Sequence, residues 1–291
     1  MKYSFIDKYK FEFPVRILCS VLNVSKSGYY SWKLRGLDCP KESNRLKLIR
    51  TIEKVHLGSR GSYGSPRVYK HIKGMGFKVS KTTVERIMRE FGIIGKKKRK
   101  FRPKTTICAP KATVSPNLLD RKFDQGAPGK VWLADITYIK MNKNWAYLAT
   151  VMDGNSRKIV GWSVQETLDR SLPIEALKMA INREDPQKGL IHHSDQGSQY
   201  ASVDYRKILD NYGLVQSMSR KGNCWDNAPM ESFYDSLKCE HIYERQFNDL
   251  SEARRSIFEW IEVFYNRIRL HSSLRYKTPA CAHEIIVANA R

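Results

Sequence analysis

Residues 130–165 read KVWLADITYIKMNKNWAYLATVMDGNSRKIVGWSVQ, and this stretch decides the fold class. It holds three short runs rich in β-branched and aromatic residues, with polar breaks at residues 142–144 and 153–156. Runs of this kind predict three consecutive antiparallel strands. Downstream, the pattern predicts a helix over residues 173–182, a strand ending at Asp195, a helix after Tyr200, a short strand at residues 214–219 and a helix after Trp225. Hairpin strands followed by alternating helices and strands predict an α/β domain in which helices cover a mixed sheet.

Both flanks of this α/β domain are predicted to be helical. Before it, residues 15–22 and a second helix from residue 25, joined by a turn at Asn23, resemble a helix-turn-helix. A second all-α unit follows, in which Pro66 opens one helix and Thr82 with Glu85 offers a capping box for the last one. After the domain, apolar residues at helical spacing predict a long C-terminal helix over about residues 251–270.

The positive charge of the chain is concentrated in its first part. The formal net charge is +23, but residues 1–110 hold 27 Lys and Arg against 7 Asp and Glu, whereas residues 111–291 hold 25 against 22. A one-sided excess confined to one region indicates a polyanionic partner, for which DNA is the leading candidate. A basic protein of the membrane surface is the alternative, although no long helix with a clean apolar face accompanies the charge.

Two basic segments are candidates for DNA contacts. The helix KTTVERIMRE carries Lys81, Arg86 and Arg89, as expected if its outer face enters a major groove. The tract KKKRKFRPK at residues 96–104 has seven positive charges in nine residues and would follow a phosphate backbone. We predict that five of its residues bind DNA: Lys96, Lys97, Lys98, Arg99 and Lys100. A solvated basic helix and a plain charged linker are the alternatives.

Composition further limits the class of protein. The six cysteines are scattered without a CxxC pair, which favours reduced thiols over a disulfide framework or a structural zinc site. No stretch approaches the roughly 18 uncharged apolar residues of a membrane span, and the N-terminus lacks the apolar core of a signal peptide. We therefore expect no membrane partner and a cytoplasmic protein, associated with the bacterial nucleoid through DNA.

Three acidic residues are candidates for a metal site. Asp135 falls in the middle of the first predicted strand, Asp195 ends the fourth, and Glu231 lies near the start of a helix. Carboxylates brought to one point repel by roughly 4 kcal/mol per pair at 4 Å and an effective dielectric constant near 20, so a cation must hold them together. Ligands that are all oxygen favour Mg²⁺ or Mn²⁺.

Other polar residues compete with this assignment. Asp153 is the main competing ligand, although an aspartate at a strand end is usually a turn or cap residue. Asp226 could cap the helix that carries Glu231, with Pro229 in its first turn. His192 and His193 could suggest a metal, but alternation along a strand points them to opposite faces, so we expect one structural histidine and one near the site.

Six motifs together carry a family resemblance, and they span nearly the whole chain. They are YGSPRV (63–68), WLADITYI (132–139), IVGW (159–162), HSDQGSQYAS (193–202), SMSRKGNCWDNAPMESFYDSLKCE (217–240) and YNRIRLHSSLRYKTPA (265–280). With them, the sequence resembles a transposase of the DDE class in the retroviral-integrase superfamily. More specifically, it is similar to the second-frame (OrfB) product of insertion-sequence-three family elements.

The resemblance implies an RNase H-like catalytic domain with Asp135, Asp195 and Glu231 as its acidic triad. It implies a DNA transposase, and therefore a polynucleotidyl transferase, that cleaves strands and joins them with two Mg²⁺ or Mn²⁺ ions per active site. Lys238, seven residues after the glutamate, matches the position that contacts the transposon end. Around it we predict DNA contacts from Asn227, Arg220 and Lys221.

The expected organisation has five parts: a helix-turn-helix-like unit at residues 1–35, a helical DNA-binding domain at 36–95, a basic linker at 96–125, the catalytic core at 126–245 and a helical extension at 246–291. The expected partners are terminal inverted repeats, target DNA, further copies of the chain on paired ends, and an upstream-frame (OrfA) protein. The alternative functions are a non-catalytic DNA-binding regulator and a structure-selective nuclease.

Overall fold

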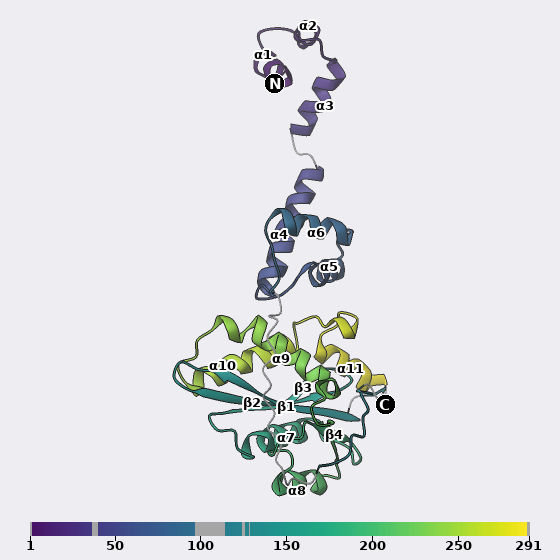
Figure 1. Ribbon diagram of the computed structural model, residues 1–291. Helices are drawn as coiled ribbons and strands as arrows, with labels where there is room; N and C mark the ends of the chain where they lie inside the picture. The colour runs from purple at the N-terminus through teal and green to yellow at the C-terminus, as the bar shows by residue number, and fades with distance from the viewer. Residues whose placement is uncertain (1, 37–39, 97–113, 124–125, 128, 290–291) are drawn as a thin grey trace.

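The computed structural model describes residues 2–36, 40–96, 114–123, 126–127 and 129–289. Four members of the predicted basic tract, Lys97, Lys98, Arg99 and Lys100, lie outside the described residues. Figure 1 shows a sheet with helices on both sides, and helices α1–α6 beyond one edge of this domain. No helix in the described part of the chain is both long enough and apolar enough to span a bilayer.

A five-stranded mixed sheet forms the centre of the larger domain. Strands β1 (Val131–Lys140), β2 (Trp145–Asp153) and β3 (Ile159–Gln165) pair antiparallel, as the sequence predicts. Strands β4 (Ile191–Ser194) and β5 (Val215–Met218) add parallel to β1, which gives the order β3-β2-β1-β4-β5. The crossover that brings β4 beside β1 places the ends of two parallel strands together in the middle of the sheet.

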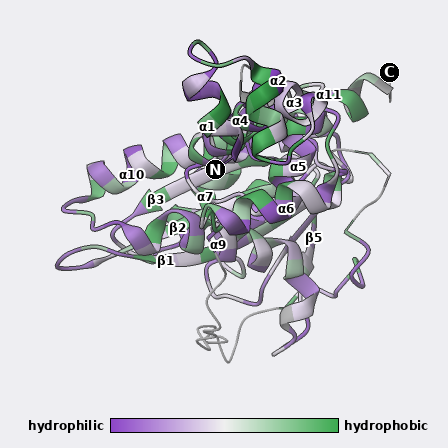
Figure 2. Cartoon of the chain, turned by 90° about the horizontal axis from the view of Figure 1, so that it is seen from above, coloured by the Kyte–Doolittle hydropathy of each residue, from purple (hydrophilic) through white to green (hydrophobic). Residues whose placement is uncertain are grey.

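Helices cover both faces because side chains of the central strand alternate between two apolar clusters. Val131 and Leu133 pack in one cluster with residues of α9 (Ala228–Glu240) and α10 (Leu250–Phe258). Trp132 and Ala134 pack in the other with residues of α7 (Ser171–Glu184) and α8 (Val203–Asn211). Figure 2 shows hydrophilic and hydrophobic residues interspersed along α10, as expected of a helix with one buried face.

Gly161 of β3 lets α7 approach the sheet closely. A Cβ atom at this position would overlap the carbonyl oxygen of Ala176 and lie 2.8 Å from the nitrogen of Ala180. The close contact explains the glycine of the IVGW motif in physical terms, since any side chain would push the helix off the strand.

The C-terminal region differs in detail from the single long helix expected. Helix α10 continues as a π-helical segment, Glu259–Tyr265, in which the Asn266 nitrogen bonds to the carbonyl of Ile261. The Asn266 amide then forms two hydrogen bonds of 3.0 Å with the backbone of Ile159, which tie this segment to β3. A short 3₁₀ turn (Ser272–Leu274) and a final helix α11 (Pro279–Asn289), which the sequence reasoning did not foresee, follow.

The N-terminal helices form two units with separate cores. Helices α1 (Lys2–Tyr9), α2 (Val15–Val21) and α3 (Lys26–Gly36) enclose a small cluster around Ile6 and Tyr29. The predicted turn between α2 and α3 is confirmed, since Asn23 adopts a left-handed conformation with φ 50°. Helix α1 was not anticipated.

Helices α4 (Pro40–Gly58), α5 (Ser65–Gly74) and α6 (Lys81–Glu90) form the second unit around their own apolar cluster. Pro66 lies in the first turn of α5, as predicted. The predicted capping box at Thr82 and Glu85 is wrong: the N-cap of α6 is Ser80, whose hydroxyl accepts the Thr83 N–H at 3.1 Å. Ser80 takes this role because its extended backbone ends the preceding loop two residues earlier than expected.

Candidate active site

Asp135 lies in β1, and Asp195 directly follows β4, the strand that pairs parallel with β1. The ladder ends with Leu133 opposite His193, two residues before each aspartate, and the charge of Asp195 acts on Asp135. Strand alternation puts Asp135 on the same face as Leu133, which is the face covered by α9. The crossover thus brings together two carboxylates that are 60 residues apart in the chain.

Each aspartate is oriented by a backbone N–H. The Asp135 carboxylate accepts the Ile136 N–H at 2.8 Å, and the Asp195 carboxylate accepts the Gly197 N–H at 3.0 Å in an Asx-type turn. A Cβ atom on Gly197 would lie 2.9 Å from the Asp195 carboxylate, so a side chain at this position would displace that carboxylate from its place in the turn. Both side chains are half-buried.

Glu231 lies in the first turn of α9, and two side chains of this region fix the helix onto β1. The Asn227 amide donates to the carbonyl oxygen of Ala134 at 3.1 Å. The Tyr234 hydroxyl donates to the carbonyl oxygen of Asp135 at 2.6 Å and forms a 2.8 Å hydrogen bond with Thr150. These bonds hold the start of α9 against the backbone on both sides of Asp135, and Glu231 is carried by that end of the helix.

The charges of the three acids act on one another. The pKa of Asp135 is raised well above its usual value, first by burial and then by the negative charges of Asp195 and Glu231, while Lys238 opposes the shift. Burial in turn lowers the pKa of Lys238, and the charge of Asp135 acts against that. Among the described residues, no three His, Cys, Asp or Glu side chains lie close enough together to hold one metal ion. The acids are therefore within electrostatic range without forming a closed set of ligands.

The competing candidates have structural partners. Asp153 is fully buried, and its carboxylate accepts hydrogen bonds from Gly129, Asn155 and Ser156, so it organises the turn after β2. His192 bonds to the Tyr205 hydroxyl at 3.0 Å on the α8 side. His193 bonds to Ser217 at 2.9 Å and Ser219 at 3.1 Å on the β5 side. The two histidines point to different surroundings as expected, but both are buried and both form bonds within the fold.

The loop before α9 is organised by Asp226, which does not cap that helix as predicted. Asn227 occupies the N-cap position without a side-chain cap bond, and Pro229 lies in the first turn. Asp226 instead binds the Arg220 guanidinium at 2.8 Å through two nitrogens, and also accepts from Arg121 at 3.1 Å. These bonds lower the pKa of Asp226. The cap prediction failed because the carboxylate satisfies two guanidiniums of the loop.

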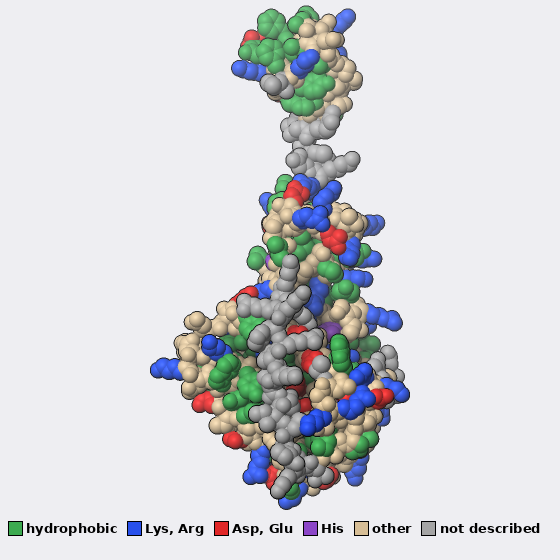
Figure 3. All heavy atoms as spheres, in the orientation of Figure 1, with side chains coloured by type: hydrophobic (Ala, Val, Ile, Leu, Met, Phe, Trp, Pro, Cys, Tyr) green, Lys and Arg blue, Asp and Glu red, His purple; other side chains and the backbone are tan. Residues whose placement is uncertain are grey.

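The residues predicted to contact DNA fall into different environments. Lys81, Arg86 and Arg89 are exposed on α6, whose opposite side is buried, and Figure 3 shows Lys and Arg side chains along the outer side of the α4–α6 unit. Lys221 is exposed in the loop before α9, and Lys238 is half-buried beside the acids. Asn227 is buried, Arg220 binds Asp226, and Lys96 contacts the end of α9.

Sequence reasoning missed the roles of Tyr234, Thr150 and Gly197 in positioning the acids. Of these, only Gly197 leaves a local signal, since Asp-x-Gly at a strand end is typical of an Asx-type turn. The bonds of Tyr234 to Asp135 and Thr150 join residues that are 99 and 84 positions apart. No spacing rule along the chain could have identified them.

Comparison with known proteins covers most of the chain. Models of an integrase core domain match residues 125–224 and 212–279, and an HTH-like domain matches residues 43–101. The insertion element IS600 uncharacterized 31 kDa protein of Shigella sonnei is 43% identical over 268 residues, which are 92% of this chain and 97% of that protein. The transposase InsF for insertion sequence IS3A of Escherichia coli (strain K12) is 38% identical over 276 residues, which are 94% of each chain.

Among solved structures, the catalytic core domain of HTLV-2 integrase in complex with magnesium is 17% identical, with a TM-score of 0.42, over 54% of this chain and 97% of that one. The observed order of an HTH-like helical unit followed by a mixed-sheet domain is the order in which the family models match. Because it is 38% identical to InsF over nearly the full length of both chains and has an integrase core domain, this chain belongs to the insertion-sequence-three (IS3) family of transposases with an RNase H-like core.

Proposed function

We propose that the protein is a DNA transposase, a polynucleotidyl transferase that cleaves the ends of an insertion sequence and joins them to target DNA. Asp135, Asp195 and Glu231 are its catalytic acids. The observation that supports this assignment is electrostatic: the charges of Asp195 and Glu231 both raise the pKa of Asp135 in the central strand. Groups with strongly shifted pKa values concentrate at functional sites, and the integrase core match covers Asp135 and Asp195.

The three acids suit Mg²⁺ or Mn²⁺ as the cofactor. They offer only oxygen atoms, and a divalent cation would remove the repulsion that disfavours ionised Asp135. When bound, two such ions supply activation of the attacking oxygen and stabilisation of the leaving oxygen in phosphodiester transfer. Since the described acids do not form a closed set of ligands, we propose that Glu231 closes toward the aspartates when DNA and metal are present.

The remaining residues position the acids and the DNA. Tyr234 and Asn227 hold α9 on β1, so that Glu231 approaches from a fixed direction. Lys238 offers an ammonium group on the same helix, seven residues after Glu231 and therefore on the same side, where it contacts a phosphate of the element end. Lys221 contacts DNA from the loop that Asp226 and Arg220 hold in place.

The N-terminal helices bind the element ends. Lys81, Arg86 and Arg89 form an exposed basic surface on α6 that suits a DNA groove. Transfer of paired ends requires that more than one copy of the protein assembles on DNA, and an upstream-frame partner would supply further end contacts. Terminal inverted repeats and target DNA are the proposed substrates.

The test uses the full-length protein with a labelled duplex that carries the element's terminal inverted repeat, with Mg²⁺ or Mn²⁺. Asp195→Ala and Glu231→Gln should reduce cleavage and strand transfer by at least about 10³-fold, as loss of one essential catalytic group typically does. Binding of the duplex should stay near the wild-type level, because the acids serve metal and not phosphate. The matched controls are Asp210→Asn on α8 and Glu166→Gln after β3, which change exposed carboxylates outside the site.

The same assay separates the competing functions. Binding of ends by the wild-type protein without cleavage or joining would support a DNA-binding regulator. Hydrolysis of branched DNA without strand joining would support a nuclease. Undiminished turnover in Asp195→Ala would refute the assignment of the acids.

A further inference from the structure

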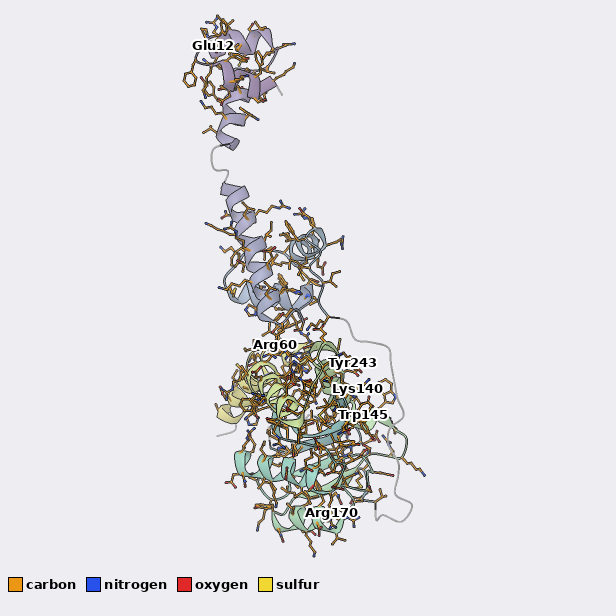
Figure 4. All side chains as sticks on the ribbon, turned by 90° about the vertical axis from the view of Figure 1, so that its left-hand side faces the viewer. Glu12, Arg60, Lys140, Trp145, Arg170 and Tyr243 are labelled. Atoms are coloured by element: carbon orange, nitrogen blue, oxygen red, sulfur yellow. The ribbon has the colours of Figure 1, made fainter. Side chains whose placement is uncertain are left out.

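Two motifs that the active site does not use meet where the α4–α6 unit contacts the catalytic domain. They are YGSPR, at the start of α5, and YNRIRLHSS, after α10. Figure 4 marks Arg60 at this junction, and its guanidinium lies 5.2 Å from the centre of the Phe264 ring. The two motifs are 198 residues apart, from Arg67 to Tyr265, and only the folded chain brings them together.

The junction is held by defined hydrogen bonds. The Tyr63 hydroxyl donates to the carbonyl oxygen of Ile268 at 3.1 Å and accepts the N–H of Leu270 at 2.7 Å. The Lys96 ammonium donates to the carbonyl oxygen of Glu240, the last residue of α9, at 2.9 Å and forms an ion pair with Glu244 at 2.7 Å. The helical unit is thereby fixed to the helix that carries Glu231.

A polar cavity of about 230 Å³ lies within this junction. Its cations are Arg67 from α5, Lys96 after α6 and Arg269 after α10. Three hydroxyls also line it, from Ser232, Ser236 and Ser272. The cavity is large enough for a phosphate group, and four separate segments of the chain contribute to its wall.

Among the charged groups of the cavity, Arg67 is the one without a close anionic partner in the described part of the chain. Arg269 binds the Glu240 carboxylate through two nitrogens at 2.6 and 2.8 Å, so this buried pair is mutually neutralised. Arg67 approaches Glu240 only to 3.7 Å, and within the described part of the chain its guanidinium forms no hydrogen bond. Its side chain is 23% exposed, it lies over the Tyr63 ring at 5.8 Å, and the charge of a second guanidinium, that of Arg269, acts on it. Such a group favours an anion as its partner.

We propose that this cavity binds one phosphate of the DNA backbone, through Arg67 and the hydroxyls of Ser232 and Ser272. The proposal rests on the proposed function, since it takes DNA to be the substrate, and it adds a second phosphate position to the active site. Ser232 directly follows Glu231 in α9. Ser232 and Ser236 are four residues apart and so share one side of the helix, next to the side that carries Glu231. A strand that enters the active site thus continues along α9 to the cavity. Because both domains line it, DNA bound there would also stabilise their contact.

The alternative is that the junction only joins the two domains. Tyr63, Lys96 and the Arg269–Glu240 pair would then be sufficient, and Arg67 would have no role in DNA binding. Neutral replacement of single phosphates distinguishes these possibilities, because it removes the charge on the DNA without changing the protein.

The experiment measures binding of full-length protein to element-end duplexes in which one phosphate at a time is replaced by an uncharged methylphosphonate. For the wild-type protein, we expect one phosphate away from the cleaved bond whose neutralisation weakens binding about tenfold or more. Arg67→Gln should weaken binding of the unmodified duplex by a similar factor and should show no further loss at that phosphate. For this variant, the slope of log binding constant against log salt concentration should be smaller in magnitude by about 0.9 than for the wild-type protein.

Two controls separate loss of the phosphate contact from loss of the domain junction. Arg255→Gln removes an exposed arginine on α10, outside the cavity, and should retain the sensitivity at that phosphate. Tyr63→Phe removes the hydroxyl bonds of the junction and leaves the cavity charges in place. This variant should therefore also retain the sensitivity to neutralisation of that phosphate. If Arg67→Gln does not fold, Arg67→Lys should weaken binding at that phosphate with an unchanged salt slope, because the charge stays and the planar fork is lost.

The inference is wrong if Arg67→Gln, or Arg67→Lys in its place, shows the wild-type methylphosphonate pattern and affinity. It is also wrong if Tyr63→Phe loses the same phosphate sensitivity, since the junction would then be responsible. Strand transfer by the wild-type protein with Mg²⁺, measured on the same duplexes, reports on the proposed function separately.

Discussion

Asp135 is the residue at which stability and function oppose each other. It lies half-buried in the central strand, and its ionised form is disfavoured by burial and by the charges of Asp195 and Glu231. Because the pKa in the folded protein is raised, the folded state loses stability as pH rises through that pKa and the proton leaves. Above the pH at which an ordinary aspartate ionises, Asp135 therefore destabilises the metal-free fold, and a bound cation would reverse that effect.

Asp135→Asn should raise the melting temperature of the metal-free protein. The amide removes the repulsion, and a gain of about 1 kcal/mol corresponds to about 2–4 °C for a protein of this size. The wild-type protein should gain stability as Mn²⁺ is added, because a ligand that binds only the folded state shifts the equilibrium toward it, and the variant should not. Thermal unfolding in EDTA and in Mn²⁺ measures both effects, with the exposed Asp210→Asn as the control. A lower melting temperature of Asp135→Asn in EDTA would contradict this account.

Helix α9 is the element that connects the parts of the site. Its first turn carries Glu231, its last turn carries Lys238, and its last residue, Glu240, binds Arg269 and Lys96 at the domain junction. Its position on β1 depends on a few polar bonds in addition to apolar packing, among which the Tyr234 hydroxyl forms the most direct link to Asp135. Loss of these bonds should affect catalysis more than DNA binding.

Tyr234→Phe tests this at the scale of the element. Removing the buried hydroxyl leaves Thr150 and the Asp135 carbonyl without a bond, which should lower the free energy of unfolding by about 1–3 kcal/mol. The start of α9 should then be less fixed, so strand transfer should fall while affinity for the end duplex changes little. Urea unfolding and single-turnover cleavage measure the two quantities. Tyr212→Phe, an exposed tyrosine after α8, is the control, and equal activity of the two variants would count against the role of Tyr234.

At the scale of the whole molecule, buried histidines make the fold sensitive to acid. Burial lowers the pKa of His192 to about 3, of His193 to about 4 and of His241 to about 3. These residues lie on β4 and at the end of α9, so they belong to the sheet and to the helix that covers it. The folded state keeps them neutral, whereas the unfolded chain takes up protons once the pH falls below about 6.5.

The free energy of unfolding should therefore fall as pH decreases from about 6.5 toward 4, since depressed folded-state pKa values of bases give stability that is lost on the acid side. Each histidine contributes about 1.4 kcal/mol per pH unit when fully protonated in the unfolded state. Asp135 acts in the opposite direction because its pKa is raised. Urea unfolding between pH 7 and 5 measures the slope, and His193→Asn should reduce it by about one proton. A flat profile would contradict this prediction.

The local and composition-dependent features of this protein could be predicted from the sequence. The three hairpin strands follow from runs of β-branched and aromatic residues, and the order of helices and strands after them follows from periodicity. The charge excess of residues 1–110 is a property of composition, and the DDE resemblance rests on residue identities that need no coordinates. Asp135, Asp195 and Glu231 could be named in the same way.

Only the tertiary structure decided which side chains act on one another. The parallel pairing of β4 with β1 places Asp195 beside Asp135, and Asn227 and Tyr234 fix α9 over the same strand. Asp226 binds arginines of its loop instead of capping a helix. Arg67 lies close enough to Arg269, across the domain junction, for their charges to interact. Secondary structure depends on residues close in sequence, whereas most of these pairs depend on how layers pack. Contacts between residues as far apart as the 60 positions from Asp135 to Asp195 and the 202 from Arg67 to Arg269 were therefore fixed only when the sheet and its helices assembled.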